Sequence, residues 1–206
     1  MTTYLRNSYP YRFFKFLGDY AAWVTNKYSA PSPNFIKQAC LIRNSIPNAT
    51  WIETGTFLGQ TTELLSKNAS KVYSIEPEPT LFANAKKHFS GYKNVSILNG
   101  TSEDVFPGLL PKIKGDVNFW LDGHYSAGIT FKGPQSTPII DELRNISENL
   151  INFNKICILV DDVRCFNLNI PEFSAYPSIE LLVDFARSHK LNWHIEHDIF
   201  IAKNWV

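Results

Sequence analysis

The sequence lacks most of the features that would set the chain apart from ordinary globular proteins. It has no apolar run approaching 18 residues and no apolar core near its start that would mark a signal peptide. Its formal net charge is only +1, which gives no bulk attraction to nucleic acid or to an anionic membrane. We therefore expect a cytoplasmic protein without nucleic-acid or membrane partners.

Cysteine is also scarce, and its pattern excludes two structural classes. The three cysteines, Cys40, Cys157 and Cys165, match neither a metal-ligand spacing nor a disulfide framework, which fits a reducing compartment. Internal repeats and low-complexity runs are missing as well. The 206 residues include 44% hydrophobic ones, enough for one domain that buries about 70% of its unfolded surface.

The first 33 residues differ in character from the rest of the chain. They are aromatic and basic, and they end in the proline-rich stretch 30–33. Residues 11–24 have the apolar spacing of an amphipathic helix, with Phe13, Phe14, Leu17, Tyr20, Ala21 and Val24 on one side. The sequence predicts a helical extension over 1–33 that covers the domain edge, contacts a second copy in a homodimer, or forms a lid over a substrate. Residues 34–206 are expected to form the main domain.

From residue 49 onward, strand patterns alternate with helix patterns. Near-continuous apolar runs, such as residues 117–121 and 156–160, are typical of strands buried on both faces of a parallel sheet. The sequence thus predicts an α/β fold, mostly parallel, with helices on both faces and a terminal antiparallel hairpin. Strands are expected at 50–54, 71–76, 95–99, 117–122, 155–161, 192–196 and 199–202, and helices at 60–68, 79–89, 102–110, 136–150 and 178–189.

The most informative stretch, residues 51–62, reads Trp-Ile-Glu-Thr-Gly-Thr-Phe-Leu-Gly-Gln-Thr-Thr. Glu53, Gly55 and Gly59 follow a short strand and lead into a helix, an order that presents backbone N–H groups and an acid at the carboxyl end of the strand. Open α/β folds bind nucleotide-like ligands at that edge. The glycine spacing matches neither the dinucleotide fingerprint G-x-G-x-x-G nor the P-loop.

Two further strand ends carry polar groups suited to the same kind of ligand. Glu76 ends the second strand, where a carboxylate can accept hydrogen bonds from two ribose hydroxyls. Thr101 and Ser102 follow the third strand within the stretch Asn-Gly-Thr-Ser-Glu-Asp.

Together, these three strand ends resemble the motifs of class I S-adenosylmethionine (SAM)-dependent methyltransferases. The resemblance implies a Rossmann-like, seven-stranded sheet over 34–206, with SAM as cofactor. It assigns the ribose to Glu76 and the adenine to Thr101, Ser102 or the backbone. Two positions depart from the motifs: Phe57 replaces the commoner middle glycine, and Thr101 stands where Asp is frequent. The implied cofactor-binding residues are Glu53, Gly55, Thr56, Phe57, Gly59, Thr61, Glu76, Pro77, Thr101, Ser102 and Asp122.

Three acidic residues follow the fourth and fifth strands, and we expect them to converge. Asp122 ends one strand, and Asp161 and Asp162 end its neighbour. Two carboxylates about 5 Å apart repel by roughly 3 kcal/mol at an effective dielectric near 20, which favours a hard divalent cation such as Mg²⁺. Alternatively, Arg164 or His124 neutralises one acid. Both Asp161 and Asp162 can bind one ion only if their strand has already ended.

This acidic pattern resembles the metal-dependent O-methyltransferases of the macrocin O-methyltransferase type. The resemblance implies methyl transfer to a hydroxyl of a small molecule, possibly a sugar or a glycosylated metabolite. We expect Asp122 to be a metal ligand and a candidate base, with His124 as the second candidate base. The loop 125–138 either shapes the acceptor pocket, with Lys132 as an anion-binding candidate, or is a solvated connector. Three rival hypotheses remain: a metal-independent N- or O-methyltransferase with a purely structural acidic cluster, a SAM-binding subunit without catalysis, and a nicotinamide oxidoreductase.

Overall fold

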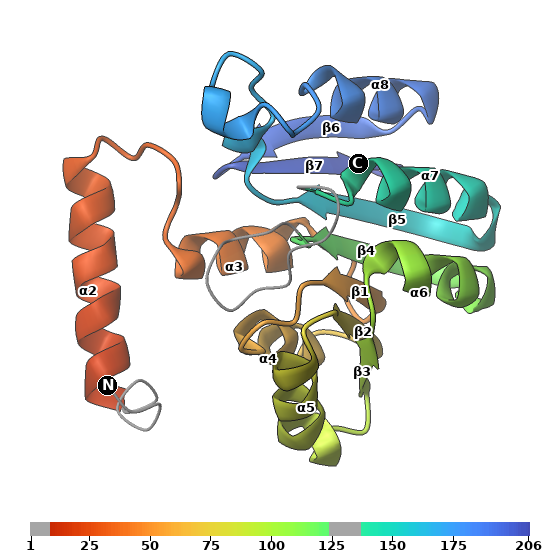
Figure 1. Cartoon of the computed structure of the whole chain (residues 1–206), viewed down its shortest axis with the longest axis horizontal. Coiled ribbons are helices and arrows are strands. Elements are labelled where there is room, and N and C mark those ends of the chain that lie inside the picture. The colour runs from red at the N-terminus through yellow and green to blue at the C-terminus, as the bar shows by residue number, and fades with distance from the viewer. Residues whose placement is uncertain (1–8, 124–136) are drawn as a thin grey trace.

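The chain forms a seven-stranded sheet with helices on both faces (Figure 1). The computed structural model describes residues 9–123 and 137–206. The strand order is β3-β2-β1-β4-β5-β7-β6, in which β1 to β5 are parallel and β7 runs antiparallel to β5 and β6. The strands are β1 (Thr50–Thr54), β2 (Lys71–Glu76), β3 (Val95–Asn99), β4 (Gly115–Leu121), β5 (Phe153–Val160), β6 (Asn192–Glu196) and β7 (Ile199–Lys203).

The predicted Rossmann-like architecture is confirmed, and the helices fall where the apolar spacing indicates. The α-helices are α2 (Tyr9–Thr25), α3 (Asn34–Asn44), α4 (Gln60–Ser66), α5 (Pro79–His88), α6 (Ser102–Leu109), α7 (Ile139–Asn149) and α8 (Glu180–Ser188). Short 3₁₀ turns lie at η1 (Phe89–Gly91), η2 (Leu110–Lys112), η3 (Leu150–Asn152), η4 (Val163–Cys165) and η5 (Pro171–Phe173).

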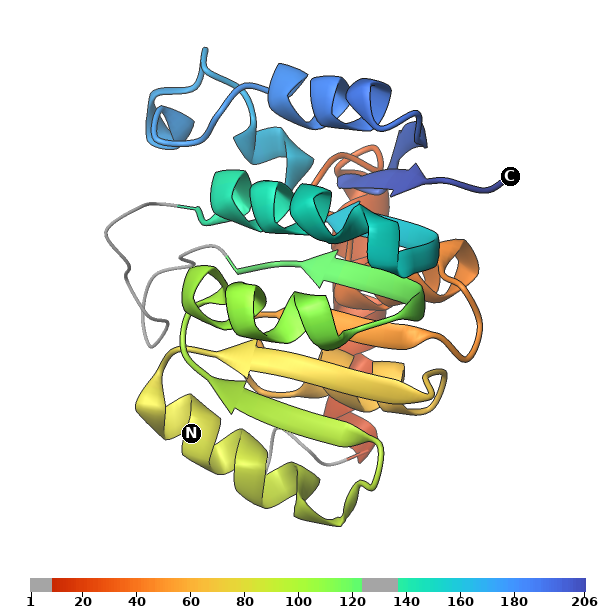
Figure 2. The ribbon, with the colours of Figure 1, turned by 90° about the vertical axis from the view of Figure 1, so that its right-hand side faces the viewer.

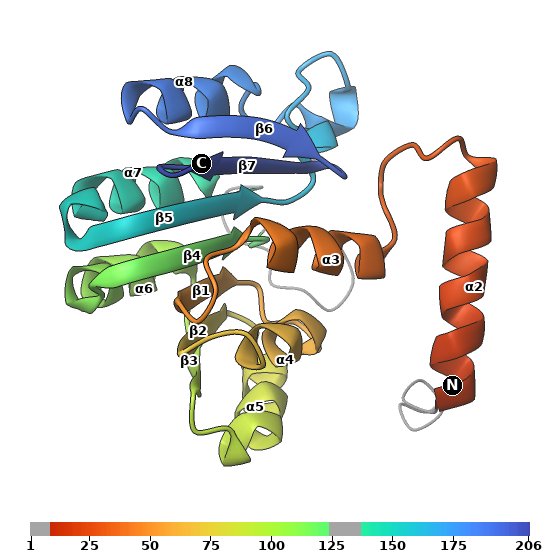
Figure 3. The same ribbon diagram turned by 180° about the vertical axis from the view of Figure 1, so that it is seen from behind.

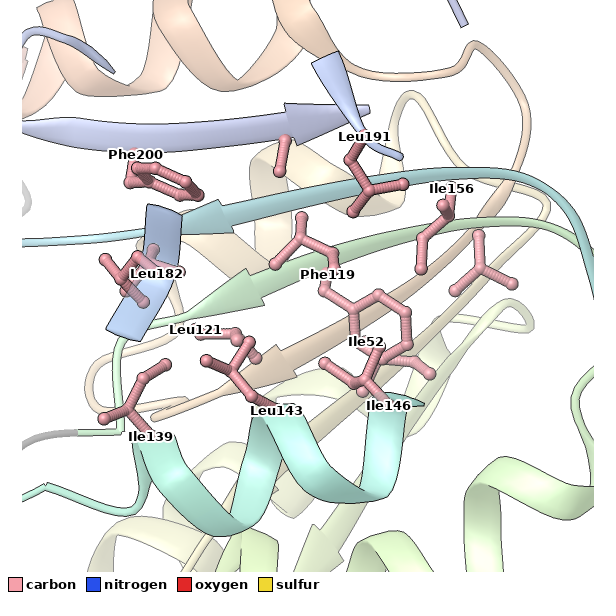
Figure 4. Packing of buried hydrophobic residues seen from close by; sticks show 14 of the residues in the cluster. Ile52, Phe119, Leu121, Ile139, Leu143, Ile146, Ile156, Leu182, Leu191 and Phe200 are labelled. Carbon is pink, nitrogen blue, oxygen red and sulfur yellow. The ribbon is translucent and has the colours of Figure 1, made fainter. Parts of the chain in front are cut away.

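Alternation along the strands divides the core into two layers. In β1, Ile52 faces the layer under α6, α7 and α8, whereas Trp51 faces the layer under α3 and α4. Figure 4 shows the first layer, in which Phe119 and Ile156 from the sheet and Leu143 from α7 belong to one buried cluster. Both faces of the central strands are therefore buried, which explains their continuous apolar sequences.

The parallel strands all point toward one edge of the sheet. Figure 2 shows the arrowheads of β2, β3 and β4 on the same side, and β1 and β5 are parallel to β4, so all five strand ends share this carboxyl edge. Glu76, Asp122, Asp161 and Asp162 lie at or just beyond a strand end on that edge, whereas Glu53 is the penultimate residue of β1.

Helix α2 stands apart from the sheet, joined to it by the turn before α3 (Figure 3). It contacts the body through Phe16 against Phe35, with ring centroids 4.3 Å apart, and through Trp23 against His197, at 5.9 Å. Phe14 on this helix is 70% exposed. The role predicted for residues 1–33 stays a prediction. No helix in the described part of the chain has the length and apolarity that a bilayer crossing requires.

Candidate functional site

The bend between β1 and α4 is built around two glycines that the packing requires. Gly55 has φ +87°, and a Cβ there would lie 2.7 Å from the carbonyl oxygen of Asp122. Gly59 has φ +76°, and a Cβ there would lie 2.8 Å from the ring of Phe89. Any side chain at Gly55 would push the bend away from β4, so the glycines bring this loop close to the neighbouring strand end.

Phe57 lies between the glycines in a conformation that glycine would adopt more easily. Its φ of +48° is in the left-handed region, which is strained for a bulky residue. This explains structurally why glycine is the commoner residue at this motif position. The Phe57 N–H donates to Oε2 of Glu76 over 2.8 Å, and the residue is 45% exposed. The bend therefore displays an aromatic ring at the carboxyl edge.

Glu76 ends β2 as predicted and ties the bend to the next helix. It is 4% exposed; Oε2 accepts from Phe57 and Oε1 accepts from the Glu78 N–H over 3.0 Å. Burial raises the pKa of this carboxyl, while the two backbone N–H groups counteract that rise. Each carboxylate oxygen has two lone pairs, so both keep capacity for another donor. The ribose assignment of Glu76 stays a prediction.

Glu53 lies inside the fold rather than at its surface. The side chain is fully buried, and its Oε2 accepts from Thr62 over 2.5 Å and from Ser74 over 2.6 Å. Within the described residues its Oε1 has no hydrogen-bond partner. Burial raises the pKa of the Glu53 carboxyl to about 7. The carboxyl thus holds β1, β2 and α4 together; its predicted cofactor contact is untested.

The other residues predicted to bind the cofactor gather around the same strand ends. Thr101 caps α6, where its Oγ1 accepts from the Asp104 N–H over 3.4 Å, and Ser102 is buried beside it. The Thr56 hydroxyl lies 2.6 Å from that of Ser74 and so faces the interior. Thr61 and Pro77 are half-buried, in the first turn of α4 and just after β2. Their cofactor roles stay predictions.

Asp122 follows β4 directly and is half-buried. Its N–H donates to Oγ1 of Thr54 over 3.2 Å, which fixes the backbone beside the glycine bend. His124 and Lys132 lie outside the described residues. The proposed roles of Asp122 and His124 as bases stay predictions.

Asp161 and Asp162 both lie beyond the end of β5, so the condition for their acting together is met. They share a cation that the sequence did not reveal. Lys37, from α3, donates to Oδ1 of Asp161 over 2.6 Å and to Oδ1 of Asp162 over 2.7 Å. Arg164 donates to the same oxygen of Asp162 over 2.6 Å and also pairs with Asp198. The alternative in which Arg164 neutralises an acid is confirmed.

As arranged, these residues do not fit a divalent cation. Two of the three acids predicted to bind it already share the Lys37 ammonium. Within residues 9–123 and 137–206, no group of three or more His, Cys, Asp or Glu side chains could hold a metal ion. The cation predicted from the acidic pattern would have to displace Lys37. Metal binding by Asp122, Asp161 and Asp162 stays a prediction.

Lys37 and Asp161 shift each other's pKa values, and Asp162 shifts both. Burial alone would lower the pKa of Lys37, but Asp161 and Asp162 outweigh burial and raise it. Burial and the adjacent Asp162 raise the pKa of Asp161, although Lys37 counteracts them. The ammonium is therefore held in its charged form by the carboxylates around it.

Sequence reasoning missed several polar contacts. Lys37 gives no local signal, because its partners lie 124 and 125 residues away. Ser74 and Asn118 are visible as single polar residues within apolar strands, and each is buried; Asn118 bonds the backbone of Ile46. Glu196, whose side chain is 27% exposed, accepts from Asn44 over 3.1 Å and pairs with Arg43, so it joins α3 to the end of β6.

Comparison with known proteins gives one curated relative. No family model matches the sequence. Ribosomal RNA small subunit methyltransferase A of Levilactobacillus brevis is 24% identical over 177 residues. The match covers 82% of the present chain and 57% of that protein, so the chain spans little more than half the length of the relative.

Solved structures share the fold at low identity. A proposed methyltransferase of Streptococcus mutans, in complex with S-adenosylhomocysteine (SAH), gives a TM-score of 0.51 at 15% identity, covering 85% of this chain and 98% of its own. Precorrin 8w decarboxylase of Methanobacterium thermoautotrophicum gives 0.54 at 13%, with 86% and 93% covered. Precorrin-6y C5,15-methyltransferase of Geobacter metallireducens gives 0.51 at 10%, with 82% and 88% covered.

These neighbours confirm the class I SAM-dependent methyltransferase fold. They do not single out the macrocin O-methyltransferase type, so that narrower resemblance stays a prediction. The rRNA methyltransferase among the relatives likewise leaves the expected absence of a nucleic-acid partner unsupported.

Proposed function

We propose that the protein transfers a methyl group from SAM to a hydroxyl of a small-molecule acceptor. The fold supports this proposal, and a structural neighbour with that fold was solved in complex with SAH. The observation that carries it is Glu76: a buried carboxylate at the end of β2 that braces the glycine bend through Phe57 and retains acceptor capacity on both oxygens. Ribose hydroxyls are donors of the matching kind.

Each part of the cofactor has proposed partners among the residues of the carboxyl edge. SAM supplies, when bound, a methyl group on an activated sulfonium. The glycine bend would hold the amino-acid part, Glu76 the ribose, and the turn before α6 the adenine. The proposed residues are Glu53, Gly55, Thr56, Phe57, Gly59 and Thr61 for the first part, Glu76 and Pro77 for the second, and Thr101 and Ser102 for the third, with Asp122 beside them.

The acceptor needs alignment and a base, because an alcohol ionises poorly at neutral pH. Alignment of two bound reactants contributes on the order of 7–11 kcal/mol through effective molarity. Asp122 is the proposed base, since it leaves β4 at the same edge as the bend. His124 is the second candidate. A hydroxyl of a sugar or a glycosylated metabolite is the proposed acceptor, an assignment that rests on resemblance.

RNA is the second candidate acceptor. The observation that favours it is the match to a relative named as a ribosomal RNA methyltransferase. A panel of glycosylated small molecules and short RNAs, assayed for transfer of labelled methyl, distinguishes the two acceptors. Label in RNA alone would replace the small-molecule assignment while leaving the methyl-transfer proposal in place.

Calorimetric titration with SAH tests the cofactor site. We expect wild type to bind one SAH and Glu76→Ala to bind it about 10-fold to 100-fold more weakly, because charged hydrogen bonds contribute about 1.5–3 kcal/mol each. Glu148→Ala is the matched control, since it removes an exposed carboxylate near the end of α7, which the proposal leaves out of the site. Equal affinity in wild type and a folded Glu76→Ala would refute the assignment of Glu76.

A further inference from the structure

A buried ammonium occupies the acidic end of β5. The Lys37 side chain is 12% exposed and those of Asp161 and Asp162 are 8% and 11% exposed, so all three charges lie largely out of water. The Lys37 nitrogen is within 2.7 Å of one oxygen from each acid. An ion shared by two neighbouring carboxylates is also the contact that a divalent cation would make. Lys37 therefore provides the positive charge that the acidic pattern demands.

The ion pair of Lys37 is not needed to attach α3 to the sheet, because other residues of α3 already make that attachment. Cys40 and Leu41 are buried in the layer between α3 and the sheet. The far end of α3 is joined to β6 through Asn44 and Arg43, which both contact Glu196. These contacts attach α3 to the sheet without any contribution from Lys37.

The surrounding geometry fits a site for one cation. Asp162 has φ +56°, a left-handed conformation that is uncommon outside glycine. Its N–H donates to Oδ1 of Asp161 over 2.8 Å, and the carboxyl groups of both residues accept from the same Lys37 nitrogen. Arg164 then balances Asp162 from the side of Asp198. The turn after β5 brings two negative charges together, and the Lys37 ammonium forms an ion pair with both.

We infer that Lys37 is a resident cation that takes the place of a divalent metal at this edge, so that the wild-type protein binds no metal between Asp161 and Asp162 and the site can be converted into a metal site by removing the ammonium. The inference concerns the carboxyl edge at which the function above is proposed. Its main test does not require methyl transfer.

Binding of Mn²⁺, followed by electron paramagnetic resonance on the full chain, tests the inference. We expect no specific Mn²⁺ binding by wild type at 1 mM, and none by Lys37→Arg, which keeps the charge. Lys37→Met leaves two carboxylates without their shared cation and should gain a site whose binding is at least 10-fold tighter than any seen in wild type. The triple variant with Asp161→Asn and Asp162→Asn added should lose it.

In the Mn²⁺ experiment, either of two results would overturn the inference. One is Mn²⁺ binding by wild type that disappears in Asp161→Asn. The other is a folded Lys37→Met that binds no Mn²⁺. Because Lys37→Met leaves buried charge unpaired, Lys37→Gln serves as a second variant with the same expectation, and a Mn²⁺-dependent rise in Tm of either variant but not of wild type is a second readout.

A separate arm connects the inference to the proposed function. Methyl transfer to any acceptor found in the panel should be unchanged by 5 mM EDTA, whereas a loss of more than 10-fold, restored by Mg²⁺, would contradict the role of Lys37. If wild type binds no SAH, the proposed function fails while the Mn²⁺ result still decides the role of Lys37. We expect Lys37→Met to bind SAH with the affinity of wild type, which would show that the substitution does not act through the cofactor site.

Discussion

Near the carboxyl edge, some side chains are costly to ionise because they are buried, and Glu53 is the clearest case. A fully buried carboxyl with one unpaired oxygen among the described residues is costly to ionise. Thr62 and Ser74 stabilise the ionised form only in part, since the pKa still rises to about 7 from an ordinary value of 4.5. Protonation of Glu53 is therefore linked to folding in the mildly acidic range.

The pH dependence of stability measures this linkage. Between pH 4.5 and about 7 the folded protein keeps a proton on Glu53 that the unfolded chain releases, so the stability due to this group falls as pH rises and is constant above. The fall across the window is about 3 kcal/mol. Glu53→Gln removes this titratable group. We therefore expect the difference in unfolding free energy, wild type minus variant, to decrease by about 3 kcal/mol between pH 4.5 and pH 8, as measured by urea titrations. A difference independent of pH would contradict the burial of this carboxyl.

Phe57 stores backbone strain that glycine would relieve. At φ +48° a Cβ costs about 1–2 kcal/mol, and both Phe57→Ala and Phe57→Gly remove the same ring. Phe57→Gly should therefore be more stable than Phe57→Ala by about 1 kcal/mol in urea unfolding, although glycine lowers stability at ordinary positions. If Phe57→Ala proved the more stable of the two, the left-handed conformation would be wrong.

At the scale of elements, the bend after β1 depends on a close approach between two strand ends. Gly55 meets the β4 backbone at Asp122, and its N–H donates to the Ile75 carbonyl of β2 over 3.0 Å. The bend thus joins three strand ends at the point where the cofactor is proposed to bind.

Gly55→Ala tests that approach. The added Cβ would require both a strained φ and a shift of the β4 backbone, so we expect a loss of about 3 kcal/mol in unfolding free energy and weaker SAH binding. Gly108→Ala is the matched control, because a Cβ there meets nothing within 4 Å and alanine favours the α6 helix by up to about 1 kcal/mol. Equal stabilities for the two variants would contradict the described packing of the bend.

Most elements could be predicted because their signals are local. The bounds of β1, β2 and β3 agree with the expected ranges, since apolar runs end at acids or turn residues there. The starts of β4 and β5 were placed two residues late, because the backbone pairing between Gly115 and Phe153 continues past polar residues that interrupt the apolar pattern. Hydrogen-bonded pairing carries no apolar signature, so sequence periodicity could not find it.

The candidate site was predictable only in part, for the same reason. Strand ends gave Glu76, Asp122, Asp161 and Asp162, because parallel strands bring their carboxyl ends to one edge. What neutralises the acids depends on α3, which lies far away in the sequence and is brought there by the fold. Side-chain partners across such distances require the three-dimensional structure.

At the scale of the whole molecule, the net charge is only +1, but charged side chains are grouped at one edge of the sheet. The two acids after β5 and Asp198 pair with the buried Lys37 and the partly exposed Arg164, so charges of both signs lie side by side at the edge proposed for catalysis. The two apolar layers pack against both faces of the sheet behind that edge. The packed sheet thereby positions the strand ends at which a cofactor and an acceptor are proposed to bind.

The central claim is that this edge binds a sulfonium donor, and titration of SAH into the wild-type protein tests it most directly. We predict saturable heat with one site per chain, and an increase in unfolding free energy of about 2.7 kcal/mol when SAH is present at 100 times its Kd. Absence of heat and of any change in stability at millimolar SAH would contradict the account.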